Sequence, residues 1–374
     1  MASLELQNIT KRFKGQTVLD DLSFHVADGE RLVLFGPSGA GKTVLLRLVA
    51  GVIDPDKGKI LIGGEDVTDV EAEHRGVGMA FQNFALFPHM SAFDNIATPL
   101  AAARASPSAV RAGVEKVAKL LKIGHVLDHA PRALSNGQKQ RTSLARALAG
   151  EPPLLLLDDP LRNVDAKLRF EMRLELPRLL ATRGATVVYV TQDYKEAMAL
   201  GDRIAVMFRG RVAQIGTPED IYRRPATREI ARLFGDPTIN LFEAAPARDA
   251  RGVHVSLSNV QLPLPQDFAA HAGRACTLGI RPEALHFADA STPGAIPVTV
   301  EAETPLNEKT VSLLLAADGR ELLLSRPAGA PGPSQGPAYV AAAPESLLLF
   351  DAGTGARLGA GGDGQAAYRS GEAA

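Results

Sequence analysis

The sequence predicts two domains of different class, an α/β domain with a parallel sheet followed by a small all-β barrel. Over residues 4–234, short β-type runs alternate with helix-length segments, the pattern of an α/β domain. From about Phe242, prolines become frequent and short alternating runs replace helical periodicity. At 374 residues the chain is also too long for one ordinary core. We therefore expect domains at residues 1–235 and 236–351, and a disordered Gly- and Ala-rich tail at 352–374.

The strands of the first domain are readable from their apolar runs. Central parallel strands are covered on both faces, so they lack alternation; Arg31–Phe35, Leu154–Asp158 and Thr186–Thr191 are such runs. Residues 1–10 alternate apolar and polar side chains and indicate a first strand, not a signal peptide. The helices expected between these strands are Lys42–Ala50, Ser108–Leu121, Gly137–Ala149 and Leu168–Arg183.

The second domain shows short alternating runs that predict the strands of a barrel or sandwich. These runs are Gly252–Leu264, Cys276–Phe287, Ile296–Glu303, Thr310–Leu315 and Glu321–Ser325.

Composition narrows the function. The net charge of −1 argues against a general nucleic-acid binder, which needs a basic excess. Cys276 is the only cysteine, which excludes an intrachain disulfide and a zinc cluster and fits a reducing, cytosolic setting. No stretch approaches the roughly 20 apolar residues of a membrane-spanning helix. A role at a membrane would therefore require something other than such a helix to hold the chain there.

A glycine-rich segment follows the first buried strand and precedes a helix. Gly36-Pro37-Ser38-Gly39-Ala40-Gly41-Lys42-Thr43 has the spacing G-x-x-x-x-G-K-[ST]. Its glycines let successive backbone N–H groups point at phosphate oxygens, and the helix adds its positive N-terminal end. Lys42 can reach the β- and γ-phosphates, and the Thr43 hydroxyl can bind magnesium. We therefore predict that this loop binds a nucleoside triphosphate with Mg²⁺.

A carboxylate completes the predicted magnesium site. The apolar run Leu154–Asp158 ends in Asp158, which would lie beside the phosphate loop and hold the ion through water.

Further motifs resemble those of the ABC-type ATPases. Leu134-Ser135-Asn136-Gly137-Gln138 resembles the family's signature motif, Phe81-Gln82 its Q-loop, and residues 163–169 its D-loop. The resemblance covers residues 4 to about 350 and implies a P-loop ATPase domain with a helical subdomain. It also implies that Phe13 stacks on adenine, that Gln82 joins both the magnesium ligands and the catalytic group, and that ATP is the nucleotide.

Within the family, the chain is most similar to ATPase subunits of bacterial importers of carbohydrates and polyols, the maltose-importer type. Residues 81–90 are similar to the segment that follows the Q-loop in that group. Residues 279–283 and 344–351 look like parts of its oligosaccharide-binding-type regulatory domain, and residues 235–240 look like the joint between the domains.

The resemblance implies a set of partners. Two ATPase subunits would pack head to tail, so that Ser135, Gly137 and Gln138 of one face the γ-phosphate on the other. Two polytopic membrane subunits would dock by Gln82–Met90, and an extracytoplasmic binding protein would complete the importer. The chain itself would lie peripherally at the cytoplasmic face of the inner membrane. Apolar side chains in the docking segment favour this role, with ordinary core packing as the alternative; they are Phe84, Leu86, Phe87 and Met90.

Two departures from the family pattern fall on the chemistry. Asp159 stands where the family has the Glu that polarises the attacking water, and its carboxylate stops roughly an ångström short, a displacement that can cost about a hundredfold in rate. Gln192 stands where the family has His; it can donate a hydrogen bond but carries no charge and relays no proton. Asn136 in the signature and Arg162 in the D-loop are milder departures.

Both catalytic departures, Asp159 and Gln192, belong to the half-site that this chain gives to its own ATP. We therefore hypothesise a slow or non-hydrolysing site in this chain and a second, non-identical ATPase subunit as its partner. A homodimer with reduced turnover is the alternative. A nucleotide-sensing regulatory protein with little hydrolysis is a second function of a different class. The cargo stays open among a sugar, a polyol such as glycerol and a glycerol phosphate.

Overall fold

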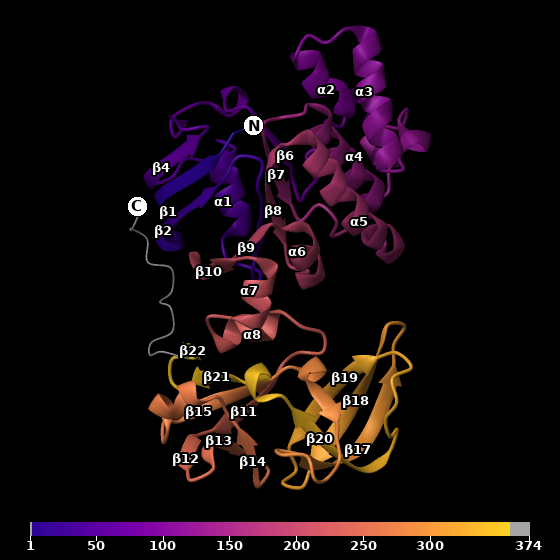
Figure 1. Ribbon diagram of the computed structural model, residues 1–374. Coiled ribbons are helices and arrows are strands. Elements are labelled where there is room, and N and C mark those ends of the chain that lie inside the picture. The colour runs from indigo at the N-terminus through magenta and orange to yellow at the C-terminus, as the bar shows by residue number, and fades with distance from the viewer. Residues whose placement is uncertain (1, 360–374) are drawn as a thin grey trace. The chain divides into compact units, whose positions relative to one another are not determined.

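The computed structural model describes residues 2–359, apart from the side chains at 179 and 181–183. The described residues form two compact units, one up to Pro218 and one from Glu219 on (Figure 1). The domain boundary predicted at residue 235 thus falls inside the second unit. Leu348 and Phe350, near the C-terminal end of that unit, share a small apolar cluster with Ala231, which explains why this stretch belongs there.

A six-stranded sheet is the centre of the first unit. Its order is β10-β9-β3-β8-β7-β6, with parallel neighbours throughout except for the antiparallel edge strand β10. The three buried strands predicted from sequence, β3, β7 and β8, are confirmed with the same bounds. Their burial is also confirmed, since β7 and β8 are buried at every position and β3 at all but its first. The strands are β3 (Arg31–Phe35), β6 (Val77–Ala80), β7 (Leu154–Asp158), β8 (Thr186–Thr191), β9 (Arg203–Phe208) and β10 (Arg211–Gly216).

A second, antiparallel sheet of order β2-β1-β4-β5 was not predicted apart from its first strand. Side chains of this sheet share one core with α1 (Lys42–Val49) and with the six-stranded sheet. The core therefore holds the start of α1, and the loop before it, against both sheets. The strands are β1 (Leu4–Phe13), β2 (Gln16–Val26), β4 (Lys57–Ile62) and β5 (Glu65–Asp66).

Helices flank the six-stranded sheet, with α1 on one side and α4, α5 and α6 on the other (Figure 1). The helices α2, α3 and α4 pack on one another as a helical subdomain. The four predicted helices are confirmed to within two residues, but α2, which contains Pro99, and the short α6 were not predicted. The helices are α2 (Ala92–Ala102), α3 (Pro107–Leu120), α4 (Asn136–Ala149), α5 (Ala166–Arg183) and α6 (Tyr194–Leu200).

The second unit begins with the short helices α7 (Pro218–Arg223) and α8 (Arg228–Leu233) and continues as antiparallel strands in three sheets. An apolar core lies among these sheets, as the all-β prediction requires. Each predicted run contains observed strands, but the first run divides into two strands at the turn Ser258–Asn259 and the second divides at the helical turn Pro282–Ala284. The strands are β11 (Asn240–Ala244), β12 (Pro246–Asp249), β13 (Gly252–Leu257), β14 (Val260–Pro263), β15 (Cys276–Ile280), β16 (Leu285–Phe287), β17 (Ile296–Pro305), β18 (Lys309–Ala316), β19 (Glu321–Pro327), β20 (Gly336–Ala342), β21 (Leu348–Asp351) and β22 (Arg357–Leu358). The strands β11, β12, β20, β21 and β22 were not predicted as runs.

The prediction of a disordered tail from residue 352 is wrong for residues 352–359. The Asp351 carboxylate accepts hydrogen bonds from the Gly353 and Thr354 backbone N–H groups at 3.1 and 2.7 Å, which builds a turn. The chain then returns as β22, which pairs with β21 and buries Leu358. The rest of the predicted tail, residues 360–374, lies outside the described residues.

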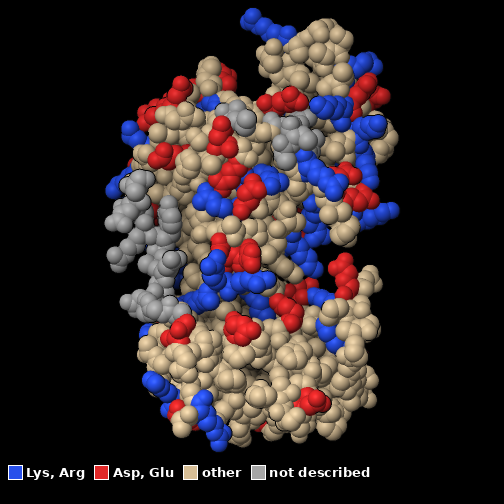
Figure 2. All heavy atoms as spheres, in the orientation of Figure 1, with Lys and Arg blue, Asp and Glu red and all other residues tan. Residues whose placement is uncertain are grey.

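Two surface findings accompany the fold. Among the residues described, none of the helices combines the length and apolar character needed to cross a membrane. On the face shown in Figure 2, blue and red side chains intermingle over the first unit and over the helices that begin the second unit, while the strands of the second unit show mostly uncharged atoms.

The Asn240 side chain is predicted to stabilise the second unit by joining two of its sheets. Its amide donates to the carbonyls of Ile280 at 3.1 Å and Leu323 at 2.9 Å, and its oxygen accepts from the Leu323 N–H at 2.8 Å. Asn240→Ala should lower the free energy of unfolding of this unit by about 1–3 kcal/mol, because it leaves partly buried backbone groups of Leu323 in β19 without partners. Urea unfolding measures the effect. The exposed Asn307→Ala is the control and should change stability by less than about 0.5 kcal/mol; equal effects of the two variants would contradict the assignment.

Candidate functional site

The glycine-rich loop turns sharply between β3 and α1. Gly36 and Gly41 have φ angles of 155° and 97°, which other residues rarely adopt. A Cβ atom on Gly36 would lie 2.3 Å from the Met207 carbonyl oxygen, and one on Gly41 would lie 2.7 Å from the Leu19 side chain. The loop conformation therefore requires glycine at both positions.

Lys42 lies beneath this loop with its side chain buried. Its ammonium donates hydrogen bonds to the carbonyls of Gly36 at 2.7 Å and Pro37 at 2.9 Å. Burial lowers the pKa of Lys42, and the nearby carboxylates of Asp159 and Asp158 act in the opposite direction. The lysine is thus a buried cation beside the turn whose N–H groups would face an anion.

Thr43 and Asp158 connect the loop to β7, although β8 lies between β3 and β7 in the sheet. The Thr43 hydroxyl donates to Asp158 Oδ1 at 3.0 Å. Burial raises the pKa of Asp158, while the Thr43 hydrogen bond, Arg47 and Lys42 lower it.

These two oxygen ligands fit the predicted Mg²⁺. Magnesium is typically held by one or two carboxylates together with substrate phosphates. Correspondingly, the described residues contain no group of three or more His, Cys, Asp or Glu side chains placed to hold a metal by themselves. Thr43 and Asp158 would hold the ion at the edge of the loop.

Asp159 follows β7 in a left-handed backbone conformation with φ of 50°, and its N–H donates to the Val190 carbonyl at 3.0 Å. Non-glycine residues in this conformation cluster at functional sites. Burial raises the pKa of Asp159, opposed chiefly by Arg162, whose Nη1 lies 3.8 Å from its Oδ2. The carboxylate is therefore buried beside a cation.

Gln192 follows β8, the strand between the loop and Asp158. Its side-chain oxygen accepts a hydrogen bond from the Ser38 hydroxyl at 3.2 Å. The strand end beneath it is anchored by Glu196, whose Oε2 accepts from Tyr189 and Thr191, each at 2.9 Å. Glu196 was missed by sequence reasoning; a carboxylate one helical turn after a strand end carries no signal of its own.

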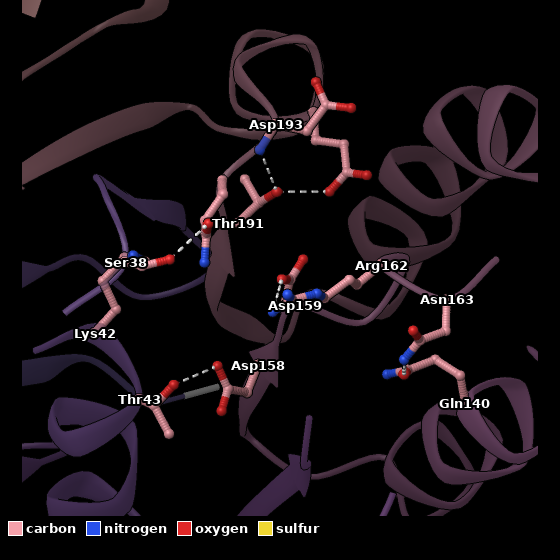
Figure 3. A network of polar contacts seen from close by, with 12 residues as sticks. Ser38, Lys42, Thr43, Gln140, Asp158, Asp159, Arg162, Asn163, Thr191 and Asp193 are labelled. Atoms are coloured by element: carbon pink, nitrogen blue, oxygen red, sulfur yellow. Dashed lines mark hydrogen bonds and ion pairs between the residues drawn. The ribbon is translucent and has the colours of Figure 1, made fainter. Parts of the chain in front are cut away.

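Lys42, Thr43, Asp158, Asp159 and Gln192 line a cavity of about 300 Å³ at the carboxyl ends of β3, β7 and β8 (Figure 3). Open α/β sheets bind ligands at this edge. The cavity includes most of the predicted site residues and also four that the sequence did not place there, namely Val18, Val44, Val190 and Arg162. Its predicted members are Ser38, Gly39, Ala40, Gly41, Lys42, Thr43, Gln82, Asp158, Asp159 and Gln192.

The other predicted site residues do not line this cavity; they are Phe13, Gly36, Pro37, Ser135, Gly137 and Gln138. Phe13 ends β1 with 43% of its surface exposed. Ser135 begins α4 as its N-cap: its hydroxyl accepts from the Gln138 N–H at 3.3 Å, and the Gln138 side chain accepts from the Ser135 N–H at 2.8 Å. Ser135 and Gln138 therefore lie at the positive end of a helix, separate from the loop of the same chain.

The segment from Gln82 to Met90 is only partly exposed. Phe87 exposes 42% of its surface, while Phe84, Leu86 and Met90 are half-buried. Arg146 of α4 donates to the Ala85 carbonyl at 2.8 Å. The segment therefore contacts α4, the helix that begins at the signature motif.

Known proteins are similar to both units of this chain. The sequence matches the family model "ABC transporter" over residues 19–162 and the "MalK OB fold domain" over residues 235–285. It is 42% identical over 358 residues to the sn-glycerol-3-phosphate import ATP-binding protein UgpC of Cereibacter sphaeroides, covering 96% of this chain and 100% of the relative. The protein of that name from Salmonella typhimurium is 41% identical over 361 residues, with 96% and 100% covered.

Solved structures are similar to the first unit. The dimeric, post-hydrolysis structure of the ATP-binding cassette MJ0796 bound to ADP and Pi has a TM-score of 0.55 and 30% identity. The match covers 57% of this chain and 98% of the cassette.

The Glu196 anchor gives a stability prediction with a defined pH dependence. Burial raises the pKa of Glu196 above 4.5, so its contribution to stability is full below about pH 4.5 and falls as the pH rises through its folded-state pKa. Glu196→Gln keeps a side-chain acceptor without the buried charge, so its stability relative to the wild type should rise from pH 5 to pH 8. Glu196→Ala leaves the two hydroxyls without an acceptor and should cost about 2–4 kcal/mol.

Urea unfolding at both pH values measures these effects, with the exposed Glu115→Gln on α3 as the control. A glutamine variant whose stability follows the wild type at both pH values would contradict the role of Glu196.

Proposed function

Since this chain belongs to the ABC transporter family of ATPases, as an importer-type energy-coupling subunit, we propose that it drives uptake of glycerol 3-phosphate or a related polyol or sugar. The cavity supports the ATPase half of this proposal, because it gathers the phosphate loop, two carboxylates and Gln192 at one sheet edge. The proposed cargo is supported by the relatives, which are named as sn-glycerol-3-phosphate import proteins. The cavity would bind ATP and not the transported molecule, so selectivity for the cargo would depend on the membrane subunits and the binding protein.

ATP would bind with its phosphates on the loop Gly36–Thr43. The backbone N–H groups and the α1 N-terminus favour the anion, and Lys42 would exchange its loop carbonyls for the β- and γ-phosphate oxygens. Thr43, Asp158 and Gln82 would hold magnesium, which neutralises phosphate charge when it is bound. Phe13 would stack on the adenine ring.

Hydrolysis at this site would be slow. Asp159 would orient the attacking water, but its carboxylate is short and its nearest cation is Arg162. Gln192 would donate to the γ-phosphate without supplying charge.

In the importer, Ser135, Gly137 and Gln138 at the start of α4 would close on ATP held by a second ATPase subunit. Two membrane subunits would dock by Gln82–Met90, and an extracytoplasmic binding protein would deliver the cargo. The chain would then lie at the cytoplasmic face of the inner membrane. The partner ATPase is either a second copy of this chain or a non-identical subunit. The slow site would favour the non-identical subunit.

Loss of the loop lysine tests ATP binding directly. Lys42→Ala should weaken MgATP binding at least about 100-fold, since it removes the charge that meets two phosphates. Lys119→Ala, exposed on α3 and outside the cavity, is the matched control and should bind as the wild type does. Isothermal titration calorimetry measures both. Equal affinity in the two variants would refute the proposed nucleotide site.

Restoring the family residues tests whether the site is attenuated. Asp159→Glu combined with Gln192→His should raise steady-state ATP hydrolysis about 10- to 100-fold in the assembled complex, because each restores a group that the reaction uses. An unchanged rate would contradict the attenuation.

Partner identity follows from complementation. In a homodimer, mixing Lys42→Ala chains with Ser135→Arg chains would rebuild one intact composite site and recover part of the activity. No recovery in that mixture, with activity appearing only beside a second ATPase subunit, would support the heterodimer. Wild-type turnover at the level of other family members in the purified chain alone would exclude it.

A further inference from the structure

Four of the residues that line the cavity carry a charge. Lys42 and Arg162 are cations and Asp158 and Asp159 are anions, so the formal charge of the lining sums to zero. ATP with one magnesium ion brings a net charge of −2. Two carboxylates therefore face an anionic ligand, and Lys42 alone cannot offset both of them.

Arg162 is the cation that sequence analysis counted as a mild departure. It lies on the turn after β7, and its N–H donates to the Asp159 carbonyl at 3.3 Å, which fixes the turn. Its guanidinium is 3.8 Å from the Asp159 carboxylate, and its side chain exposes 53% of its surface. No described residue accepts a hydrogen bond from the guanidinium.

The pair between Arg162 and Asp159 is therefore loose. The Asp159 carboxylate is mostly buried, but the Arg162 side chain is half exposed and lies 3.8 Å from it without a hydrogen bond, so the guanidinium is not held in one geometry. The five guanidinium donors match the geometry of a phosphate, with which they form bidentate hydrogen bonds. A terminal phosphate in the cavity would be a stronger partner than Asp159.

Arg162 shares the cavity with Gln192, the neutral residue in place of the family's histidine. Lys42 enters this space from the phosphate loop and Arg162 from the turn after β7, with Asp159 between them in the view of Figure 3. The two cations thus approach the ligand space from different elements.

We propose that Arg162 is a γ-phosphate-binding residue that supplies the positive charge absent at Gln192. When ATP binds, the guanidinium leaves Asp159 and donates to the terminal phosphate, which frees the Asp159 carboxylate to face water. ADP has no terminal phosphate at this position, so Arg162 stays with Asp159. The residue therefore makes the site selective for the triphosphate. This inference rests on the proposed nucleotide site.

Nucleotide affinities of Arg162 variants test the proposal. The probes are the non-hydrolysable ATP analogue adenylyl imidodiphosphate and ADP, each with magnesium, measured by calorimetry on the full chain. Arg162→Ser should weaken binding of the ATP analogue about 10- to 100-fold and binding of ADP less than about 2-fold. Arg162→Lys keeps the positive charge but loses the bidentate hydrogen bonds of the guanidinium, so its affinity for the analogue should lie between those of the wild type and Arg162→Ser.

A matched control comes from α3. Arg111 forms an exposed ion pair with Glu115, also at 3.8 Å and outside the cavity, so Arg111→Ser should leave both affinities unchanged. Thermal unfolding of all variants verifies that they fold.

The outcomes separate this inference from the proposed function. Wild-type protein that binds neither nucleotide would refute the nucleotide site itself. Wild-type binding with equal losses for both nucleotides in Arg162→Ser, or with no loss for either, would overturn the role of Arg162 alone.

Discussion

The hydrogen bond from the Thr43 hydroxyl to Asp158 depends on the parallel arrangement of the central sheet. Thr43 follows β3 and Asp158 ends β7, more than 100 residues later in the chain, yet their oxygens are 3.0 Å apart. Parallel strands place their carboxyl ends at one edge, so the loop, the carboxylates and Gln192 meet there. The buried apolar residues of β7 and β8 hold this edge in register. Without that core, the carboxylates and Gln192 would not be held opposite the phosphate loop.

Local signals in the sequence were sufficient for much of the fold. The loop spacing, the apolar strands and four of the helices follow from patterns within a few residues. The antiparallel sheet could not be predicted as a whole, because β1 pairs with β4, as between Leu4 and Ile62, across a gap that contains the loop and α1. The turn after Asp351 was missed for a different reason: one carboxylate organises it, within a composition that is otherwise typical of disorder.

Only some of the charged and polar residues of the candidate site could be predicted from the sequence. The sequence identified Asp159 and Gln192 as departures, since motifs fix their positions relative to the loop. It could not place Arg162 in the cavity, because side-chain direction depends on the turn after β7 and on its hydrogen bond to the Asp159 carbonyl. Glu196 is visible only once Tyr189 and Thr191 are seen to share it. Electrostatics at this edge is thus a property of the assembled sheet.

The shared cavity also bears on how such a site changes over evolutionary time. Asp159, Arg162 and Gln192 border one small space, and residues this close are not independent in their energetic effects. The effect of exchanging any one of them depends on which residues already occupy the other two positions. Ancestral intermediates with single exchanges would therefore differ in fitness according to the order of the steps. Sequences of this lineage should change at the three positions together.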